Sequence, residues 1–390
     1  MPDPHSSAPR RTPLAEVHES LGAVMTDFAG WLMPLRYGSE TREHIAVRSA
    51  AGLFDLSHMG ELFVTGPDAA AALDYALVGE ASVIKPGRAR YSMICTVDGG
   101  IVDDLIVYRL ADDDFLIVAN AANATTVAAE LAERTAGFDA SIADRTHEYA
   151  LIAIQGPRAA AILAGLTDAD LDPLRYYASI RATVAGRDVL LARTGYTGED
   201  GFELFTAPAH APELWQALAA AGQEAGLVPA GLAARDSLRL EAGMPLYGNE
   251  LSRDVSPYDA GLGRVVKLDK AGGFVGRDAL AKRAQQASRR LLVGLVSQTR
   301  RVPRHGYPVL CDGEPCGSVT SGGPSPTLGK PIAMAYIDAA AAQPADADPP
   351  PGENAPGDDA AAQQLAVDVR GTAEPVILVP LPFYRRSDTN

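Results

Sequence analysis

The stretch Tyr91-Ser-Met-Ile-Cys-Thr-Val-Asp-Gly-Gly-Ile-Val-Asp-Asp-Leu-Ile-Val-Tyr-Arg109 decides the fold prediction, because it has the pattern of a β-hairpin. Two runs rich in β-branched and aromatic residues flank the turn sequence Asp98-Gly99-Gly100. Asp-Gly and Gly-Gly pairs supply the positive φ angles that a tight hairpin turn needs. The stretch therefore predicts two antiparallel strands joined by a short turn.

The second predicted strand carries two acids, Asp103 and Asp104, inside an apolar run. Because side chains alternate faces along a strand, we expect one face to hold Ile101, Asp103, Leu105 and Val107, and the other Val102, Asp104, Ile106 and Tyr108. Whichever face is buried takes a carboxylate with it, which costs free energy or shifts the pKa of that carboxylate. Two interpretations stay open: an acid on a polar face or in a salt bridge, and an acid held in a cleft for a bound molecule.

The composition indicates a globular chain of several domains. Its 390 residues are too many for one ordinary hydrophobic core, so we expect two or three domains. Hydrophobic residues make up 47%, and no run approaches the roughly 18 apolar residues of a membrane span. The net charge of −15 argues against nucleic acid or an anionic membrane as the main partner.

The cysteines and the N-terminal residues predict a reducing compartment. Cys95, Cys311 and Cys316 form no Cys-x-x-Cys pair, and an odd number does not make a disulfide framework. Residues 1–12 lack the apolar segment typical of a signal peptide. We therefore expect a cytoplasmic protein.

An internal repeat predicts two similar units. Residues 61–73 and 151–163 both have the pattern of a strand, a Gly-Pro turn and an Ala-rich helix, with Pro67 and Pro157 at helix-opening positions. A hairpin pattern and a second Ala-rich helix follow each of them. The order β-α-β-β-α is that of two ferredoxin-like α+β units. Two such units side by side often leave a cleft in which ligands bind.

Polar residues stand at two further positions where a strand is predicted. Residues 52–60 predict a strand with a polar tip, at which His58 is either a general base or a hydrogen-bonded structural residue. A Gly-rich loop at 195–201 joins two strands of the second unit, and Glu203 follows it among apolar neighbours. This segment is either a surface hairpin with one outward glutamate or part of a binding site.

Residues 231–243 predict a helix that ends at Gly243. Arg235 and Arg239 are four residues apart and therefore lie on one face of this helix. Two guanidinium groups on one face could bind a carboxylate in bidentate fashion. The alternative is a solvated face paired with Asp236 or Glu241.

The C-terminal domain, residues 289–386, consists of short predicted strands with frequent turns, the pattern of a small antiparallel β-barrel. Residues 339–364 interrupt this pattern without periodicity, so we expect a disordered insertion in a barrel loop. Residues 12–282 hold the two α+β units. Motifs for a phosphate-binding loop, a dinucleotide site, a zinc protease or an α/β-hydrolase are not found, and we expect no metal site.

Several motifs together resemble the aminomethyltransferase (T-protein) family of the glycine cleavage system. They are Phe28-Ala-Gly-Trp31, Phe54-Asp-Leu-Ser-His-Met59, Gly99-Gly-Ile-Val-Asp-Asp-Leu-Ile-Val107, Gly195-Tyr-Thr-Gly-Glu-Asp-Gly201, residues 231–243 and Thr320-Ser-Gly-Gly-Pro-Ser-Pro326. The resemblance covers about Thr12 to Tyr384, apart from 339–364. It implies a cloverleaf of three domains around a central cavity that holds tetrahydrofolate. The lipoyl arm of a carrier (H) protein, loaded with an aminomethyl group, would enter this cavity. The methylene of that group would pass to the folate to give 5,10-methylenetetrahydrofolate, ammonia would leave, and the arm would depart as a dithiol.

The resemblance also implies the roles of individual residues. It makes Asp104, rather than Asp103, the catalytic acid. Glu203 matches a folate-binding acid and Arg235 a substrate-binding arginine of the family. Further positions that line the folate site are matched by Tyr91, Asn120, Tyr196, Met59 and, in the C-terminal tail, Tyr384.

The implied reaction moves a one-carbon unit between nitrogen and sulfur atoms, so it needs no protein nucleophile and no metal. Positioning of the reactants and a fixed carboxylate next to developing positive charge would supply the catalysis. Two alternatives remain: a related tetrahydrofolate-dependent demethylase that acts on a small methylated donor, and a non-catalytic folate-binding protein.

Overall fold

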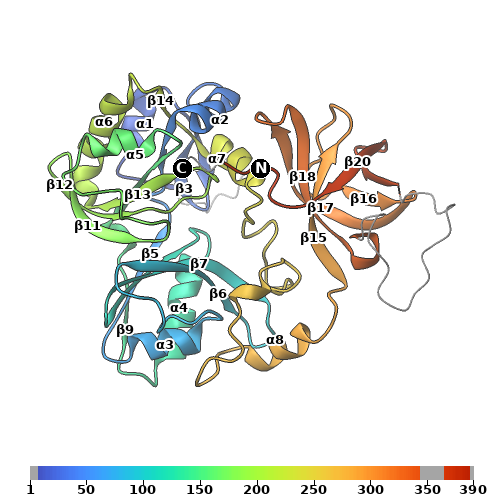
Figure 1. The fold of residues 1–390 in the computed structure, drawn as a ribbon, viewed down its shortest axis with the longest axis horizontal. Helices are drawn as coiled ribbons and strands as arrows, with labels where there is room; N and C mark the ends of the chain where they lie inside the picture. Colours follow the sequence, from blue (N-terminus) through green and yellow to red (C-terminus); the bar gives the residue numbers. More distant parts are fainter. Residues whose placement is uncertain (1–7, 343–363, 387–390) are drawn as a thin grey trace.

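The computed structural model describes residues 8–342 and 364–386, which form three lobes (Figure 1). Two lobes are α+β units and the third is a β-barrel, as predicted. A small sheet and two helices precede the first unit along the chain: β1 (Arg10–Arg11), α1 (Ala15–Ser20), β2 (Val24–Phe28), β3 (Trp31–Arg36) and α2 (Glu40–Ser49).

The first α+β unit contains the predicted hairpin. Its elements are β5 (Gly60–Thr65), α3 (Ala69–Ala76), β6 (Arg88–Cys95), β7 (Ile101–Ala111), β8 (Asp114–Ala119), α4 (Ala124–Thr135) and β9 (Ser141–Asp144). The sheet has the order β6-β7-β8-β5-β9. Four of these strands, in the sheet order β7-β8-β5-β9, have the ferredoxin-like arrangement. The strand β6 is an additional strand at the edge.

The second unit repeats this plan with one exchange. Its elements are β10 (Ala150–Gln155), α5 (Ala159–Ala164), β11 (Ser179–Val184), β12 (Arg187–Ala192), β13 (Gly201–Thr206), α6 (Ala211–Gly222) and β14 (Leu227–Pro229). The sheet has the order β11-β12-β13-β10-β4-β14, so that β4 (Ala51–Asp55), which precedes the first unit, lies inside the second sheet.

Two details of the predicted units are wrong. The predicted order β-α-β-β-α omits the edge strand β11 and the final strands β9 and β14. The strand β11 is polar and half-exposed, and β9 and β14 are short, so none of them has a clear apolar pattern. Pro67 and Pro157 do not open the helices but lie in the preceding turns. There Gly66 and Gly156 have φ of +125° and +135°, and a Cβ would approach main-chain oxygens to 2.6 and 2.5 Å.

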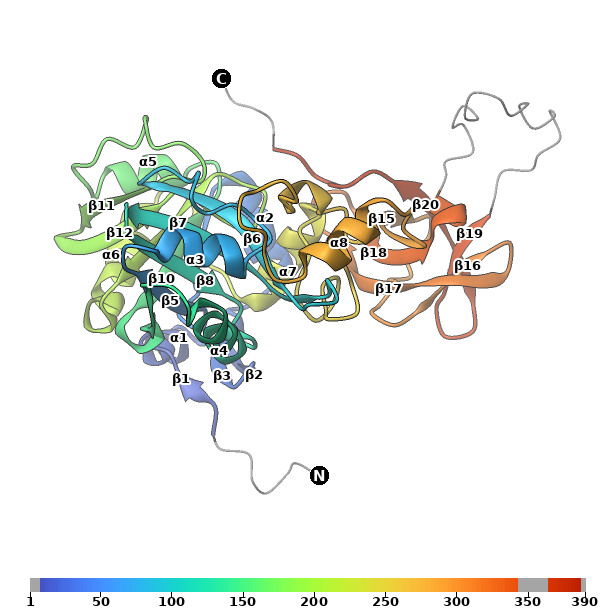
Figure 2. The ribbon, with the colours of Figure 1, turned by 90° about the horizontal axis from the view of Figure 1, so that it is seen from below.

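The two sheets pack face to face, and helices cover their outer faces (Figure 2). The shared core between the sheets includes Phe54, Phe63, Tyr108, Leu151 and Phe205. The outer core of the first unit lies under α3 and α4, and that of the second lies under α5 and α6. Side chains on the inner faces of the two sheets therefore meet. Asp104 on β7 and Glu203 on β13 come from these two sheets.

The helix α7 (Leu232–Glu241) lies centrally between the lobes (Figure 1). It packs against α2 and β3 on the side of the second unit and against β17 and β18 on the side of the barrel. After it, residues 244–276 run along the first unit to α8 (Arg277–Ala284). This course places α7 in contact with both the α+β region and the C-terminal domain.

The C-terminal domain is a closed barrel in the order β15-β18-β17-β16-β19-β20. Its strands are β15 (Arg290–Ser297), β16 (Pro308–Cys311), β17 (Glu314–Ser325), β18 (Lys330–Asp338), β19 (Leu365–Asp368) and β20 (Ala373–Val379). The predicted insertion at 339–364 begins too early, because Ala339–Ala342 form a 3₁₀ helix whose Ala341 is buried in the barrel core. Residues 343–363 lie outside the described residues. In the parts that are described, no helix is long and apolar enough to span a membrane.

Candidate active site

A β-bulge in the first hairpin corrects the predicted faces of Ile101 and Val102, the two residues before the acids, and leaves the predicted faces of the acids unchanged. Asp103 pairs with Ile94 and Ile101 with Cys95, which leaves Val102 as the extra residue. Strict alternation therefore fails at this point, and Val102 joins the core on the side of Leu105. Both faces of β7 are covered, so that Asp103 is fully buried and Asp104 half-buried.

Asn120 joins the two carboxylates. Asp103 accepts hydrogen bonds from the main-chain nitrogen and Nδ2 of Asn120, at 3.0 and 2.9 Å, and from Nδ2 of Asn123 at 2.7 Å. Asp104 accepts from Nδ2 of Asn120 at 2.9 Å and from the Tyr91 hydroxyl at 3.0 Å. Each oxygen of Asp104 is thereby fixed in direction by one donor.

Burial raises the pKa values of both acids. The pKa of Asp104 rises to about 6, although hydrogen bonds from Tyr91 and Asn120 favour its ionised form. Burial and, secondarily, the charge of Asp104 raise the pKa of Asp103 to about 7. Burial also raises the pKa of Tyr91, whose hydroxyl therefore stays protonated as a donor. The pair changes its protonation near neutral pH, as expected for groups that handle protons.

Glu203 lies on the opposite sheet and reaches toward the first unit. Its Oε2 accepts from the Thr194 hydroxyl at 2.5 Å and from the Tyr108 hydroxyl at 3.3 Å. Tyr108 is on the same face of β7 as Asp104, so these bonds connect the two sheets. Burial raises the pKa of Glu203. Its Oε1 has no hydrogen-bond partner among the described residues and is not fully enclosed.

Arg235 on α7 has no carboxylate partner within the described part of the chain. Its guanidinium lies over the Tyr196 ring, 4.7 Å from the ring centre. Burial lowers the pKa of Arg235, while the nearby charges of Tyr196 and Glu203 oppose this shift. A half-buried cation without an ion pair retains its hydrogen-bond donors for a ligand.

The predicted clamp of two arginines is wrong. Arg239 is buried, pairs with Glu250 at 3.0 Å and with Asp236 at 2.8 Å, and donates to Ser321 of the barrel at 2.7 Å. The two side chains begin on one helix face but end in different environments, because Arg239 is drawn into the contact between α7 and the barrel. Of the two arginines, only Arg235 has no ion pair among the described residues and is available to bind a ligand.

The other predicted residues divide between the inner core and the tail. Met59 packs at the core between the sheets, and the Tyr196 hydroxyl donates to the Pro245 carbonyl at 2.5 Å. Tyr384 instead lies against Arg48, with its ring centre 4.0 Å from the guanidinium carbon, and contacts Glu199. Its described contacts do not join it to Asp104, so its place in a folate site stays a prediction.

His58 makes no hydrogen bond with the described residues, so the interpretation as a hydrogen-bonded structural residue is wrong, while a role as general base stays a prediction. It is buried, its Nδ1 has no hydrogen-bond partner among the described residues, and its ring meets the edge of Phe28. Burial and the charge of Arg235 lower the pKa of His58 to about 4, which leaves it neutral and weakly basic at neutral pH. The described side chains also form no cluster of three or more His, Cys, Asp or Glu residues that could hold a metal ion.

Three further neighbours of the site, Tyr108, Thr194 and Tyr177, were not identified from the sequence. Tyr108 could have been found, because it stands four residues after Asp104 on the same strand face. Thr194 and Tyr177 had no signal, since their position depends on how the second sheet packs against the first. Tyr108 and Thr194 matter for the site because both donate hydrogen bonds to Glu203.

Known proteins share both the sequence and this fold. Residues 14–270 match the GCVT N-terminal domain, and residues 290–385 match the glycine cleavage T-protein C-terminal barrel domain. An aminomethyltransferase of Streptomyces avermitilis is 62% identical over 98% of this chain and 99% of its own. One of Moorella thermoacetica is 46% identical over 97% of this chain and 98% of its own. The crystal structure of the glycine cleavage system aminomethyltransferase T from Bartonella henselae covers 97% of this chain and 98% of its own, with 37% identity and a TM-score of 0.86.

The chain therefore belongs to the glycine cleavage T-protein family. It is an enzyme, and the activity that its relatives share over their full length is that of an aminomethyltransferase. These relatives favour aminomethyl transfer over the two alternatives left open by the sequence, a demethylase and a non-catalytic binder.

Proposed function

We propose that Asp104, Glu203 and Arg235 bind tetrahydrofolate as the acceptor of a one-carbon unit, which the lipoyl arm of a carrier (H) protein delivers. One observation carries this proposal: Glu203 and Arg235 are half-buried, opposite in charge and close enough to influence each other's pKa, yet they form no ion pair. Buried charges are normally paired. A ligand with both hydrogen-bond donors and acceptors would satisfy both groups.

A pteridine ring fits this set of side chains. Its N–H groups would donate to Glu203, whose Oε1 lacks a partner among the described residues, and its acceptor atoms would receive bonds from Arg235. Tyr196 and Met59 would contribute an aromatic and an apolar surface. Hydrogen bonds from Tyr108 and Thr194 hold Glu203 in one orientation before the ligand arrives.

Asp104 is proposed as the catalytic group. Bound tetrahydrofolate supplies the amine nitrogen that accepts the methylene. The carboxylate of Asp104, fixed by Tyr91 and Asn120, would stabilise the positive charge that develops on the transferred carbon and on the departing ammonia. Because these donors fix the carboxylate before the reaction, little reorganisation is needed when the charge appears.

Folate affinity tests the binding residues. We expect Arg235→Ala or Glu203→Ala to weaken tetrahydrofolate binding about 10- to 100-fold, because each removes a hydrogen bond to a charged group in a half-buried site. Titration calorimetry on the full chain measures this. The matched control is Arg42→Ala, which removes an exposed arginine of α2. Unchanged affinity in both site variants would remove Glu203 and Arg235 from the folate site.

The pH dependence of turnover tests the role of Asp104. The pKa of Asp104 is raised to about 6, so the required carboxylate is present above that pH and is lost as the pH falls through it. We expect kcat/KM for folate to decrease below about pH 6, approaching tenfold per pH unit. Near-UV circular dichroism over the same range controls for unfolding. A rate that stays constant from about pH 5 to 8 would contradict ionised Asp104 as the active form.

A further inference from the structure

Two cysteines meet inside the C-terminal barrel. Cys311 ends β16 and Cys316 lies near the start of β17, on the two sides of a turn whose residues Asp312 and Gly313 have φ of +51° and +90°. Cys316 belongs to the barrel core, and Cys311 is partly buried and packs against the same core. The two thiols are in hydrogen-bonding contact. The barrel therefore holds two sulfur atoms next to each other.

The strand register explains why these two side chains meet. Cys311 pairs with Glu314 across the turn, and a register shift further along the hairpin leaves Cys316 as the extra residue of a β-bulge. Cys311 lies on the same face of β16 as Val309, which belongs to the barrel core. The bulge places Cys316 in that core as well. Both thiols thus lie on the inner side of one hairpin, as a disulfide across the two strands requires.

The turn between the two cysteines is also held from outside the hairpin. The main-chain nitrogen of Asp312 donates to the Gln364 carbonyl at 3.0 Å, and the Gln364 nitrogen donates to the Asp312 carboxylate at 3.0 Å. The Cys311 thiol donates to the same carboxylate at 3.9 Å. Directly after Gln364, β19 pairs with β16 as far as Cys311. A backbone fixed in this way keeps the two thiols together, which favours a bond between them over a bond to another molecule.

The thiols differ in exposure and in acidity. Cys311 is partly exposed, whereas burial and, secondarily, the neighbouring Cys311 raise the pKa of Cys316 to about 11. A thiol with such a pKa is protonated at neutral pH, and only a thiolate attacks a disulfide. Cys95 is fully buried in the first α+β unit, and burial raises its pKa to about 12. Cys311 is therefore the cysteine that a dissolved oxidant reaches first.

We propose that Cys311 and Cys316 form a redox site that closes to a disulfide by exchange with a small-molecule disulfide. The Cys311 thiolate attacks one sulfur atom of the oxidant and forms a mixed disulfide, while the other half of the oxidant leaves as a thiolate. The Cys316 thiol then loses its proton and attacks the Cys311 sulfur, and the second half of the oxidant leaves. The two cysteines lose two electrons and two protons in total, and the oxidant is reduced to two thiols.

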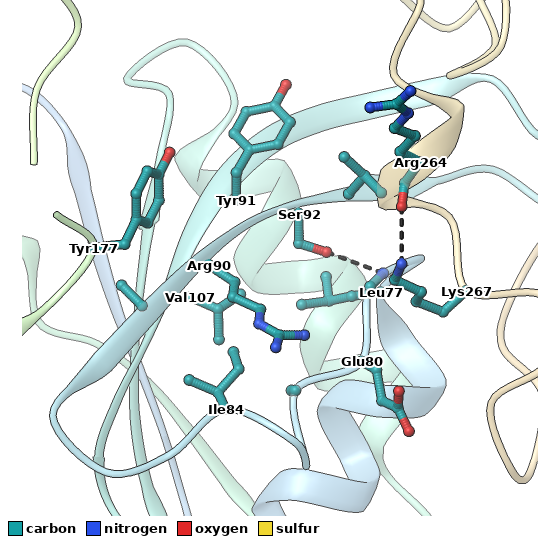
Figure 3. A pocket seen from close by; sticks show the side chains of 14 residues that line it. Leu77, Glu80, Ile84, Arg90, Tyr91, Ser92, Val107, Tyr177, Arg264 and Lys267 are labelled. Atoms are coloured by element: carbon teal, nitrogen blue, oxygen red, sulfur yellow. Dashed lines mark hydrogen bonds between the residues drawn. The ribbon is translucent and has the colours of Figure 1, made fainter. Parts of the chain in front are cut away.

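The site is separate from the candidate active site. A cavity of about 460 Å³ beside that site is lined by Tyr91 and Tyr177 among others, and none of its lining residues is a cysteine (Figure 3). Closing the bond should therefore leave ammonia release unchanged. In a reducing compartment, which the cysteine pattern predicts, such a bond forms transiently when the oxidant increases. While it is closed, it protects Cys311 from irreversible oxidation to a sulfinic acid.

The test incubates the full chain with oxidised glutathione and counts free thiols after denaturation. We expect the count to fall from three to one, the mass to fall by two hydrogen atoms, and dithiothreitol to reverse both changes. A protease that cleaves before aspartate cuts between Cys311 and Asp312. The two fragments should therefore stay joined until the reductant is added. The matched control Cys95→Ala should form the same bond and retain no free thiol.

Single variants test the order of attack. Cys316→Ser cannot close the bond, so glutathione should stay attached to Cys311. Cys311→Ser should carry at least about tenfold less glutathione, because Cys316 is buried and protonated. The fragment test uses the unmodified protein and decides the question even where a variant does not fold. Three free thiols after treatment, or a bond that includes Cys95, would overturn the proposal. Equal amounts of attached glutathione in the two variants would overturn the assigned order.

Discussion

Asp104→Asn should lower turnover by about 10²- to 10⁴-fold and leave the fold intact. The amide has nearly the shape of the carboxylate, its oxygen can still accept from Asn120, and its NH₂ group can donate to the Tyr91 hydroxyl. What disappears is the negative charge next to the transferred carbon. Folate affinity should change much less than turnover, because the charge matters most when positive charge develops in the transition state.

The measurement for Asp104→Asn is ammonia release from a carrier protein whose lipoyl arm bears an aminomethyl group, with and without tetrahydrofolate. The unmodified protein should show strong release that depends on the folate. Asp103→Asn is an informative comparison. The Asp103 carboxylate accepts three hydrogen bonds from N–H groups, and the NH₂ group of an asparagine cannot accept from such donors. That variant should lose stability while keeping the Asp104 charge. Near-normal release by Asp104→Asn would contradict the assigned role.

Arg48→Met should have the largest effect on stability. Arg48 is nearly buried, pairs with Glu199 at 2.9 Å and Glu241 at 3.0 Å, and donates to the Thr197 carbonyl at 2.7 Å. Removing one partner of a buried ion pair leaves an uncompensated charge, at a cost of about 3–5 kcal/mol. The negative charge of Glu241 would persist in the variant. Although burial opposes ionisation, hydrogen bonds from His44 and from hydroxyl groups lower the pKa of Glu241 to about 2.

The effect of Arg48→Met should extend into the barrel. Glu241 also accepts hydrogen bonds from Ser325 at 2.5 Å and from Thr327 at 2.7 Å, both on the barrel side. Thermal unfolding followed by calorimetry measures the change in stability. The matched control is Arg42→Met on the exposed side of α2, which should change stability by about 0.5 kcal/mol or less. Equal unfolding of the two variants would show that the buried pair contributes little.

Much of the fold could be predicted, because its signals are local. The hairpin at residues 91–109 follows from its turn sequence, and the barrel from short strands with frequent turns. The bulge at Val102 could not be predicted from alternation, since it depends on the register between β6 and β7. The insertion of β4 into the second sheet likewise depends on partners about a hundred residues away.

The candidate site shows the same limit on individual residues. Arg235 and Arg239 have the same side chain and the same helix face, and only their surroundings separate a ligand-binding group from a structural one. Arg239 meets Glu250 and Ser321, which come from other parts of the chain. The contact between Cys311 and Cys316 could not be predicted either, because it depends on the bulge in the hairpin of β16 and β17.

The place of β4 in the second sheet has a consequence for how the chain is assembled during its synthesis. Residues 51–55 leave the ribosome first, but their hydrogen-bonding neighbours are β10 at 150–155 and β14 at 227–229. All five residues of β4 are buried in the finished protein. The nascent chain must therefore keep an apolar strand from pairing wrongly while the whole first unit is made. The sheet of the second unit is complete only when its final strand, β14, has been made and has paired with β4, whereas the sheet of the first unit consists of its own strands alone.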